Sequence, residues 1–521
     1  MRHTNNIEKI FDVAIIGGGI NGVGIARDMA GRGLSVLLCE KGDLGGATSS
    51  ASTKLIHGGL RYLEHLEFRL VRESLSERAI LMKSAPHIVT PLRFIMPKVA
   101  GGRPRWLLKL GLYLYDHLAA RGDIPSAKAL DLKQDQAGDA LVSSLKRPAL
   151  SYWDCWTEDN RLVILNAIDA RDRGASIYTH MRVEKARRHN DLWHLDALSA
   201  PSDEPPLAYG FKARSLVNAA GPWAGQILSD QIGYDIPKRL TLVKGSHIVV
   251  PRLFSHESAY LFQNTDGRII FAIPFEQNFT LIGTTDIVFK GDLDNPEISQ
   301  EEIDYLIDVA SKFFKKPPDR SDIIFSFTGV RPLYGAEDNP SKVSRDYHLE
   351  LDAPDNKAPL LNIFGGKLTT YRCLAQEAVH ALGRTMPISS KDWTEKAILP
   401  GGDLPYGADF KRNLEDFMGC YAWLPEPLAR RYLRTYGSLA DRLLEDCNSF
   451  EDLGAEIAPD VYEAELAYAM AHEWVRDGVD FLYRRTKLGL STPEKDRQSV
   501  DRWLHEQASN NVQKQETQLK I

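Results

Sequence analysis

The N-terminal hydrophobic pattern predicts a strand, a helix and a second strand. Val13 to Ile16 are four consecutive apolar residues, as expected for a strand buried on both faces of a parallel sheet. A glycine-rich turn and a helical segment follow, and Leu34 to Cys39 form the next largely apolar run. This order is typical of an α/β fold built on a parallel sheet.

The middle of the chain interrupts this pattern and then resumes it. Leu60 to Met82 has the apolar spacing of one amphipathic helix, whereas about Pro86 to Lys146 mixes short apolar runs with proline, glycine and basic residues. A helix is predicted at Asp159–Arg173, and strands at Ser176–Val183 and Ser215–Ala219. The first lobe is therefore expected to be discontinuous in sequence.

From Arg239 to Asp286 the pattern changes to alternating, β-rich segments, which predict an antiparallel sheet in a second lobe. Residues 322–335 and 359–373 are predicted strands that lead back to the first lobe, and the chain becomes helical and charged beyond about Lys391. We therefore predict a two-lobed region at 1–391 (first lobe about 10–85, 147–238 and 322–391; second lobe about 86–146 and 239–321) and a helical C-terminal domain at 392–521.

The turn after the first strand has the spacing of a dinucleotide-binding motif. Gly17, Gly19 and Gly22 form G-x-G-x-x-G, and Glu40 ends the second strand. These glycines permit a tight turn, a close approach of backbone to a pyrophosphate, and close packing of helix on strand, while Glu40 suits ribose hydroxyls. The alternative, a glycine-rich turn without a ligand, does not account for this context. NAD and FAD share the motif, so it does not choose between them.

Composition narrows the function classes. The 521 residues carry a net charge of −6, which argues against a general nucleic-acid-binding protein. The five cysteines have no C-x-x-C spacing and are expected to be reduced thiols in a cytoplasm. The sequence has neither a secretory signal pattern nor an apolar run long enough to span a bilayer, so we expect no membrane-spanning helix.

The run GATSSASTKLIHGGLRYL at 46–63 resembles the FAD-dependent glycerol-3-phosphate dehydrogenase family. Similar blocks recur along nearly the whole chain: VNAAGPWA at 217–224, LVKGSHIVVPR at 242–252, IGTTD at 282–286, SFTGVRPL at 326–333 and FGGKLTTYR at 364–372. The bacterial aerobic members match best, because the sequence lacks the calcium-binding loop and transit peptide expected of mitochondrial relatives. We therefore predict FAD as the cofactor, and no metal.

The resemblance implies an α/β fold with a Rossmann-like FAD-binding domain of the glutathione-reductase or D-amino-acid-oxidase type, an antiparallel substrate lobe and a helical C-terminal domain. Short hydroxyl side chains in the serine-rich loop suit close approach to a flavin, and Gly365-Gly366 opens a helix that in this family points at the flavin. The predicted cofactor residues are Gly17, Gly19, Gly22, Glu40, Thr48, Ser49, Ser50, Lys54, Val183, Gly221, Gly365, Lys367, Leu368 and Thr369.

The resemblance also implies oxidation of sn-glycerol 3-phosphate to dihydroxyacetone phosphate, by hydride transfer from C2 to flavin N5. Arginine matches phosphate oxygens in a bidentate manner, so cations in apolar or glycine-rich context are the candidates. The predicted substrate-binding residues are Arg61, Tyr62, Thr284, Arg331, Arg345 and Lys367. His247 and His57 are candidate bases, whereas Arg331 would stabilise the developing alkoxide; we place Arg331 first and His247 second.

The electron acceptor of this family is a membrane quinone, so we expect ubiquinone or menaquinone and a peripheral position on the inner face of the cytoplasmic membrane. The basic, aromatic and leucine-rich segment 103–115 suits a bilayer interface, with a core helix as an equal alternative. Other interpretations stay open: a soluble oxidase of the same substrate that makes hydrogen peroxide, an amine or 2-hydroxy-acid oxidoreductase, and a non-catalytic flavoprotein. A homodimer is implied by the resemblance alone.

Overall fold

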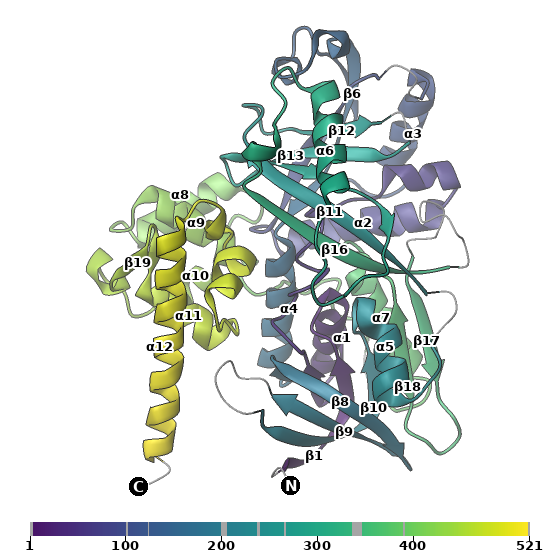
Figure 1. Ribbon diagram of the computed structural model, residues 1–521, viewed down its shortest axis with the longest axis vertical. Coiled ribbons are helices and arrows are strands. Elements are labelled where there is room, and N and C mark those ends of the chain that lie inside the picture. The colour runs from purple at the N-terminus through teal and green to yellow at the C-terminus, as the bar shows by residue number, and fades with distance from the viewer. Residues whose placement is uncertain are drawn as a thin grey trace.

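Two sheet-based lobes and a helical domain make up the molecule (Figure 1). The computed structural model describes residues 4–99, 103–122, 124–199, 206–236, 240–264, 267–335, 346–388 and 391–518. The lobes are stacked along the long axis, and the helical domain, in green and yellow, lies beside them. Among the described helices, none is both long enough and apolar enough to cross a bilayer.

The first lobe is built on a sheet with a parallel centre. Strand β1 pairs in parallel with β2 on one side and with β10 on the other, and β10 pairs in parallel with β18. The antiparallel strands β9 and β17 pair with β10 and β18. The strands of this sheet are β1 (Thr4–Ile16), β2 (Val36–Cys39), β7 (Ser176–Tyr178), β8 (Met181–His189), β9 (Leu192–Ser199), β10 (Ala208–Asn218), β17 (His348–Asp352) and β18 (Leu360–Phe364).

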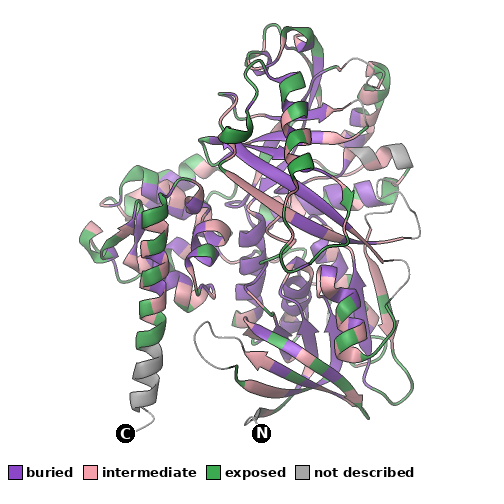
Figure 2. Cartoon of the chain, in the orientation of Figure 1, coloured by how far each residue is buried: buried purple, intermediate pink, exposed green. Residues whose placement is uncertain are grey.

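Helix α1 (Ile20–Gly31) joins β1 to β2 and packs against α4 (Asp159–Asp172) and α7 (Tyr371–Leu382). All three pack closely because α1 is rich in small residues: a Cβ on Gly24 would lie 2.7 Å from the Tyr371 ring. Figure 2 shows α1 and α4 as mostly buried. The N-terminus of α1 is therefore held firmly at the carboxyl end of β1.

The second lobe is a larger, mostly antiparallel sheet. Its order is β15-β11-β14-β13-β12-β4-β6-β3, with β16 on β11 and β5 on β6. The β4–β12 pair is parallel, an exception to the antiparallel prediction. The strands are β3 (Leu55–Ile56), β4 (Val89–Met96), β5 (Lys128–Asp131), β6 (Pro148–Thr157), β11 (Leu240–Pro251), β12 (Ala259–Gln263), β13 (Ile269–Phe275), β14 (Phe279–Gly283), β15 (Ile287–Val288) and β16 (Phe325–Tyr334).

The helices of the second lobe frame its sheet. Helix α6 (Gln300–Phe313) starts with a capping box, in which Ser299 and Glu302 each accept a backbone N–H of the other. Its buried residues, such as Leu306 and Phe313, belong to the core of the sheet. The remaining helices are α2 (Phe68–Ser84) and α3 (Arg105–His117), with the short helical turn Leu60–His65 before α2.

The C-terminal domain is helical, as predicted. It consists of α8 (Phe410–Cys420), α9 (Glu426–Tyr436), α10 (Leu439–Leu443), α11 (Glu463–His472) and α12 (Glu494–Gln518), a two-stranded sheet of β19 (Glu456–Ala458) and β20 (Val461–Tyr462), and the helical turn Asp480–Arg485. Buried Arg161 of α4 pairs with buried Glu473, which follows α11. The domain is thus joined to the first lobe through buried charges.

Strand pairing corrects the predicted lobe boundaries. Strands β3, β6 and β16 lie in ranges that we assigned to the first lobe, yet their hydrogen-bonded partners are in the second sheet. In particular, β16 pairs with β11 along its length instead of joining the first sheet. An apolar or alternating pattern identifies a strand, but its partner is fixed by long-range pairing, which the pattern does not encode.

Two predicted elements are each divided in the structure. The helix predicted at 60–82 is interrupted at Leu66, which has a φ of 59°, so that a helical turn and α2 replace one continuous helix. The strand predicted at 176–183 is broken at His180, which has a φ of 51°, into β7 and β8. Positive φ values end regular structure locally. Leucine gives no sequence signal for such a value, and histidine gives only a weak one.

Candidate active site

The glycine turn after β1 forms a cradle without side chains. A Cβ on Gly22 would lie 1.9 Å from the Gly17 carbonyl oxygen, and a Cβ on Gly17 would lie 2.6 Å from the Ala219 carbonyl oxygen. Only glycine fits these positions. Gly17 also has a φ of 110°, which other residues rarely adopt. The backbone at the start of α1 is therefore open to close approach by a ligand.

Two predicted residues border this turn. The Glu40 carboxylate accepts hydrogen bonds from the Gly18 N–H (2.6 Å) and the Gly42 N–H (2.9 Å). The Ser49 hydroxyl accepts a hydrogen bond from the Ile20 N–H at 3.0 Å, and its oxygen would lie 3.2 Å from a Cβ on Gly19. The serine-rich loop thus meets the first turn of α1.

Val183 lies on β8, and Gly221 lies in the turn after β10. Val183 is buried on β8, which begins where the Met181 N–H donates to the Glu40 carbonyl at 2.7 Å. Gly221 follows β10, whose end is fixed to β1 by a hydrogen bond from the Ala219 N–H to the Ile16 carbonyl. Both positions therefore border the same end of the β1–β2 pair.

Residues of segment 48–57 form hydrogen bonds with the second sheet and with the loop before α7. The Thr48 hydroxyl donates to the Val330 carbonyl on β16 at 2.6 Å. Further along, the Thr53 hydroxyl lies 3.0 Å from His247 Nε2, and the His57 N–H donates to the Thr369 hydroxyl at 3.2 Å. One stretch of chain therefore contacts α1, β16, β11 and the loop before α7. Ser50 lies within this stretch, where its hydroxyl donates to the Ala47 carbonyl.

Lys54 is part of a buried ion pair. Its Nζ lies 2.7 Å from the Asp159 carboxylate, and both side chains are almost completely buried. The Asp159 carboxylate also accepts a hydrogen bond from the Ser52 hydroxyl at 2.8 Å. Lys54 thereby anchors the serine-rich loop to the N-terminus of α4, and its predicted proximity to a flavin stays a prediction.

The second glycine pair packs against the first motif. Gly365 and Gly366 follow β18, and their φ values of 77° and 101° need glycine. The Asn21 side chain donates to the Gly365 carbonyl at 3.0 Å. Leu368 and Thr369 complete the turn that leads into α7, and Thr369 is buried. The two loops that the sequence analysis singled out for the flavin are thus in direct contact.

Arg331 and Thr284 converge over Gly245. A Cβ on Gly245 would lie 2.5 Å from Arg331 Nη2 and 2.8 Å from Thr284 Oγ1, so the glycine leaves room for both side chains. Arg331 Nη2 also lies 3.4 Å from Asp286 Oδ1. The Arg331 side chain is 28% exposed, so it is not sealed off from a ligand. A cation and a neutral hydroxyl are thereby held side by side on the second sheet.

His247 is adjacent to this pair and is buried. Its ring stacks on Phe327 with the centroids 4.8 Å apart, and a Cβ on Gly283 would lie 2.1 Å from it. Burial, reinforced by the charges of Lys54 and Arg331, lowers the pKa of His247 to about 3. The imidazole is therefore neutral at physiological pH, and its Nδ1 has no hydrogen-bond partner among the described residues.

Lys367 and Tyr62 form a second group. Lys367 Nζ lies over the Tyr62 ring, 3.8 Å from its centroid, a cation–π contact. Burial lowers the pKa of Lys367. The side chain of Arg61 and the whole of Arg345 lie outside the described residues, so their predicted roles rest on the sequence. His57 contributes through its backbone to the contact with Thr369.

Several residues that complete the site carried no clear sequence signal. Asn21 occupies a variable position of the glycine motif, and only the fold directs it at Gly365. Thr53 orients His247, while Asp159 and Asp286 pair with the predicted cations Lys54 and Arg331. Asp286 ends the block IGTTD, so the sequence could have pointed to it. Asn21, Thr53 and Asp159 are each distant in sequence from the residue that they contact.

These residues fit a bound FAD. The glycine cradle admits a pyrophosphate where any Cβ would clash, and the start of α1 offers N–H donors to its oxygens. Buried polar atoms without a partner in the described chain, Asn21 Oδ1 and His247 Nδ1, lie beside the two predicted flavin loops. A ligand with donors and acceptors along its edge would satisfy such atoms.

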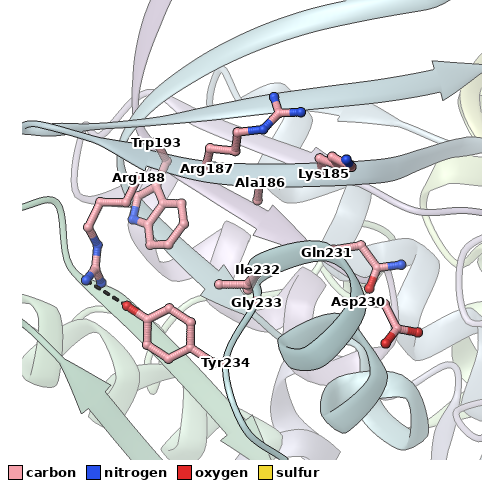
Figure 3. A pocket seen from close by; sticks show the side chains of 10 residues that line it. All are labelled: Lys185, Ala186, Arg187, Arg188, Trp193, Asp230, Gln231, Ile232, Gly233 and Tyr234. Atoms are coloured by element: carbon pink, nitrogen blue, oxygen red, sulfur yellow. Dashed lines mark hydrogen bonds between the residues drawn. The ribbon is translucent and has the colours of Figure 1, made fainter.

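A separate cavity of about 440 Å³ opens between β8, β9 and the turn at 230–234 (Figure 3). Arg188 lines it but already bonds Tyr234 at 2.9 Å and Asp352 at 2.7 Å. Arg187, another lining cation, pairs with Asp196. The cavity contains none of the predicted site residues, and we assign it no function.

Comparison with known proteins identifies the family. The model of the FAD dependent oxidoreductase family matches residues 12–372, and that of the C-terminal domain of alpha-glycerophosphate oxidase matches 393–513. A glycerol-3-phosphate dehydrogenase of Pseudomonas aeruginosa is 48% identical, covering 93% of each chain, and a D-erythritol 1-phosphate dehydrogenase of Brucella abortus is 45% identical, covering 95% of this chain and 97% of the relative.

A solved structure extends the likeness to three dimensions. The glycerol-3-phosphate dehydrogenase of Bacillus halodurans, complexed with FAD, is 30% identical and superposes with a TM-score of 0.76, covering 96% of this chain and 91% of the other. The sequence prediction of a Rossmann-like FAD fold with a helical C-terminal domain is thereby confirmed. The chain belongs to the FAD-dependent oxidoreductase family, and its cofactor is FAD.

Proposed function

We propose that this protein is a glycerol-3-phosphate dehydrogenase, which oxidises sn-glycerol 3-phosphate to dihydroxyacetone phosphate. The observation that carries the proposal is the placement of Arg331 beside Thr284 and next to neutral His247. Oxidation of a secondary alcohol needs a group that stabilises the negative charge developing on its oxygen, and hydrogen-bonding groups that accept the hydroxyl proton. Relatives with this name, at up to 48% identity over most of the chain, support the same substrate.

The protein side chains divide the remaining work. When bound, FAD would supply the acceptor for the hydride that leaves C2 of the substrate. Arg331 stabilises the negative charge that develops on the C2 oxygen, and Thr284 adds a neutral hydrogen bond. Lys367, with Tyr62, binds the phosphate together with Arg61 and Arg345. Burial is the main cause of the lowered pKa of His247, and Lys54 and Arg331 add to it. Negative charge on the substrate oxygen beside Arg331 would offset part of the effect of that cation and favour transfer of the hydroxyl proton to His247.

A second substrate is favoured by one relative, the D-erythritol 1-phosphate dehydrogenase at 45% identity. The two candidate substrates share a phosphate and a secondary alcohol and differ in chain length. Anaerobic titration of the purified holoprotein with each substrate, followed by flavin absorbance, separates them. Faster bleaching by sn-glycerol 3-phosphate supports our proposal, faster bleaching by D-erythritol 1-phosphate replaces it, and no bleaching by either rejects both.

We also propose that reduced FAD passes its electrons to ubiquinone or menaquinone at the inner face of the cytoplasmic membrane. Support comes from α3, where Trp106 and Tyr113 are 68% and 60% exposed, with Leu107 and Leu110 also exposed. Arg105 and Lys109 on the same helix suit anionic headgroups. A group of exposed apolar side chains on one surface typically marks a site that binds a protein or a membrane.

Two measurements test this acceptor and location. Reoxidation of the bleached flavin by a ubiquinone analogue but not by oxygen supports the dehydrogenase, whereas rapid reoxidation by oxygen with peroxide supports the oxidase. Sedimentation with anionic lipid vesicles should fall when Trp106 and Leu110 are both changed to Ser, but not when exposed Tyr406 of the C-terminal domain is changed to Ser. Equal sedimentation of both variants would reject α3 as the anchor.

Two further proposals concern the division of the chain into domains and its oligomeric state. We propose the domain division at about residue 392, with the lobes bounded as the strand pairing requires. We also propose a homodimer, on the family resemblance alone. Light scattering of the detergent-solubilised protein tests the homodimer, since one chain has a mass of 58.4 kDa.

A further inference from the structure

The loop that carries the predicted flavin residues is held by the C-terminal domain. Asp43 lies in this loop, between Glu40 and the serine-rich run. Its carboxylate accepts hydrogen bonds from Arg485 Nη2 (2.7 Å) and Nη1 (2.8 Å) and from Arg484 Nε (2.6 Å). Arg485 grips both carboxylate oxygens in the bidentate geometry typical of strong arginine–carboxylate pairs.

This contact is buried and strongly paired. The side chains of Asp43 and Arg485 are 1% and 0% exposed. Burial by itself would raise the pKa of Asp43, but the charges and hydrogen bonds of Arg485 and Arg484 outweigh it and lower that pKa. An ionised carboxylate in such a place depends on its partners, because removal of one leaves an uncompensated buried charge.

Short hydrogen bonds lead from Asp43 to the glycine motif. The Gly46 N–H donates to the Asp43 carbonyl at 3.0 Å, and the Gly45 N–H donates to the Gly18 carbonyl at 3.0 Å. Gly18 lies between the first two glycines of the motif. The loop then reaches Ser49, whose hydroxyl accepts from the first residue of α1. The conformation at Asp43 therefore sets where the pyrophosphate cradle and the serine-rich loop meet.

A parallel connection runs through the start of α4. Arg485 Nη1 donates to the Asn160 side-chain oxygen at 3.3 Å, and the Asn160 amide donates to the Leu44 carbonyl at 3.0 Å. The preceding residue, Asp159, holds Lys54 and Ser52 of the same loop. Lys487 Nζ lies 3.9 Å from Glu158. The C-terminal segment 484–487 thus contacts the flavin loop directly and also through α4.

We propose that Arg485 and Arg484 are positioning residues for FAD: the C-terminal domain holds the loop at 41–54 in the conformation that binds the cofactor. The domain is then a structural part of the cofactor site and not only an appended module. This inference depends on FAD as the cofactor and is independent of which phosphorylated alcohol is oxidised. The competing explanation is that the arginines merely stabilise the folded chain.

A matched pair of variants separates the two explanations. Arg485→Gln breaks the contact with Asp43. Arg431→Gln breaks a similar bidentate pair, Arg431 with Glu465 at 2.6 and 2.7 Å, which lies wholly within the C-terminal domain. The holoprotein of each is prepared, FAD is removed, and the dissociation constant for added FAD is measured by quenching of flavin fluorescence. Circular dichroism establishes that each apoprotein is folded at the temperature used.

We expect Arg485→Gln to raise the dissociation constant for FAD by about tenfold or more, and Arg431→Gln to change it less than about twofold. Asp43→Asn should raise the dissociation constant at least as much as Arg485→Gln, because it also weakens the pairing with Arg484. The loss in the double variant should be smaller than the sum of the two single losses, because the two residues share one contact. Equal losses in Arg485→Gln and Arg431→Gln, or no loss in either, would overturn the proposal.

A conservative variant covers the case in which Arg485→Gln does not fold. Arg485→Lys retains the charge but loses the fork that grips both carboxylate oxygens. On our proposal its dissociation constant for FAD lies between those of the wild type and Asp43→Asn, and segment 41–54 becomes more sensitive to limited proteolysis in the apoprotein. Wild-type FAD affinity and unchanged proteolysis in Arg485→Lys and Asp43→Asn together would reject a positioning role.

Discussion

Replacement of Arg331 by Ala should strongly lower the turnover rate and leave FAD binding unchanged. Removing one positioned donor that stabilises developing charge typically lowers the rate constant by about 10²–10³-fold. Arg331 is 28% exposed, so water partly replaces it, and we expect a loss near the lower figure, about 10²-fold. Its pairing with Asp286, at 3.4 Å and partly exposed, contributes at most ~1 kcal/mol to stability, so the protein should fold and retain FAD.

The assay is the rate of flavin bleaching after anaerobic rapid mixing with sn-glycerol 3-phosphate. Arg320→Ala is the matched control, because Arg320 forms an exposed ion pair with Asp304 and its hydrogen bonds, within the described part of the chain, go to Asp304 and Gln300. It should bleach within about twofold of the wild-type rate. Asp286→Asn frees Arg331 from its carboxylate without removing the guanidinium, and should have a smaller effect than Arg331→Ala. A bleaching rate for Arg331→Ala equal to that of Arg320→Ala would refute the assignment.

Three further perturbations test other parts of the site. Gly22→Ala places a Cβ 1.9 Å from the Gly17 carbonyl oxygen and should abolish FAD retention. Gly419→Ala is the control, because a Cβ on this helical residue would meet no atom within 4 Å apart from its own helix backbone and chain neighbours. The flavin content after gel filtration distinguishes the two variants. Lys367→Met should raise KM for the phosphorylated substrate by about 10–100-fold with FAD absorbance unchanged, since a charged hydrogen bond is worth ~1.5–3 kcal/mol; an unchanged KM removes Lys367 from the phosphate site. Burial lowers the pKa of His247 from 6.5 to about 3 in the folded protein. The free energy of unfolding is therefore unaffected by this group above pH 6.5 and decreases as the pH falls from 6.5 towards 3, because the unfolded chain binds the proton more readily. His247→Gln should therefore flatten the decline of Tm between pH 7 and pH 5, and parallel Tm curves for the two proteins would contradict the neutral, buried state.

Local spacing was enough to predict the cofactor motif. Gly17, Gly19 and Gly22 must stand at fixed offsets because the turn and the first helical residues are contiguous in the chain, and the structure has the predicted strand, helix and strand there. The helix at α4 and the four β-rich segments of the second sheet were also predicted, since their apolar periodicity is a local property.

Features that depend on distant partners were beyond sequence reasoning. The pattern of residues 325–334 indicates a strand, yet nothing in it identifies β11 as the neighbour. Asp43 is one carboxylate among 70 acidic residues until the fold brings Arg485 to it. The same holds for the buried ion pair of Lys54 with Asp159, whose two residues are distant in sequence.

The Asp43–Arg485 ion pair also bears on biosynthesis. Its two residues are 442 positions apart, so the loop at 41–54 is synthesised long before the arginine that pairs with it. A ribosome adding ~5–20 residues per second needs tens of seconds to cover that distance. Throughout this interval the glycine motif has emerged without its C-terminal support, and β1 lacks its parallel neighbour β10 for the first half of it. On our proposal, the nascent chain reaches its full affinity for FAD only after Arg484 and Arg485 have been synthesised and have paired with Asp43. Truncated products that lack these two residues should bind FAD more weakly than the full chain.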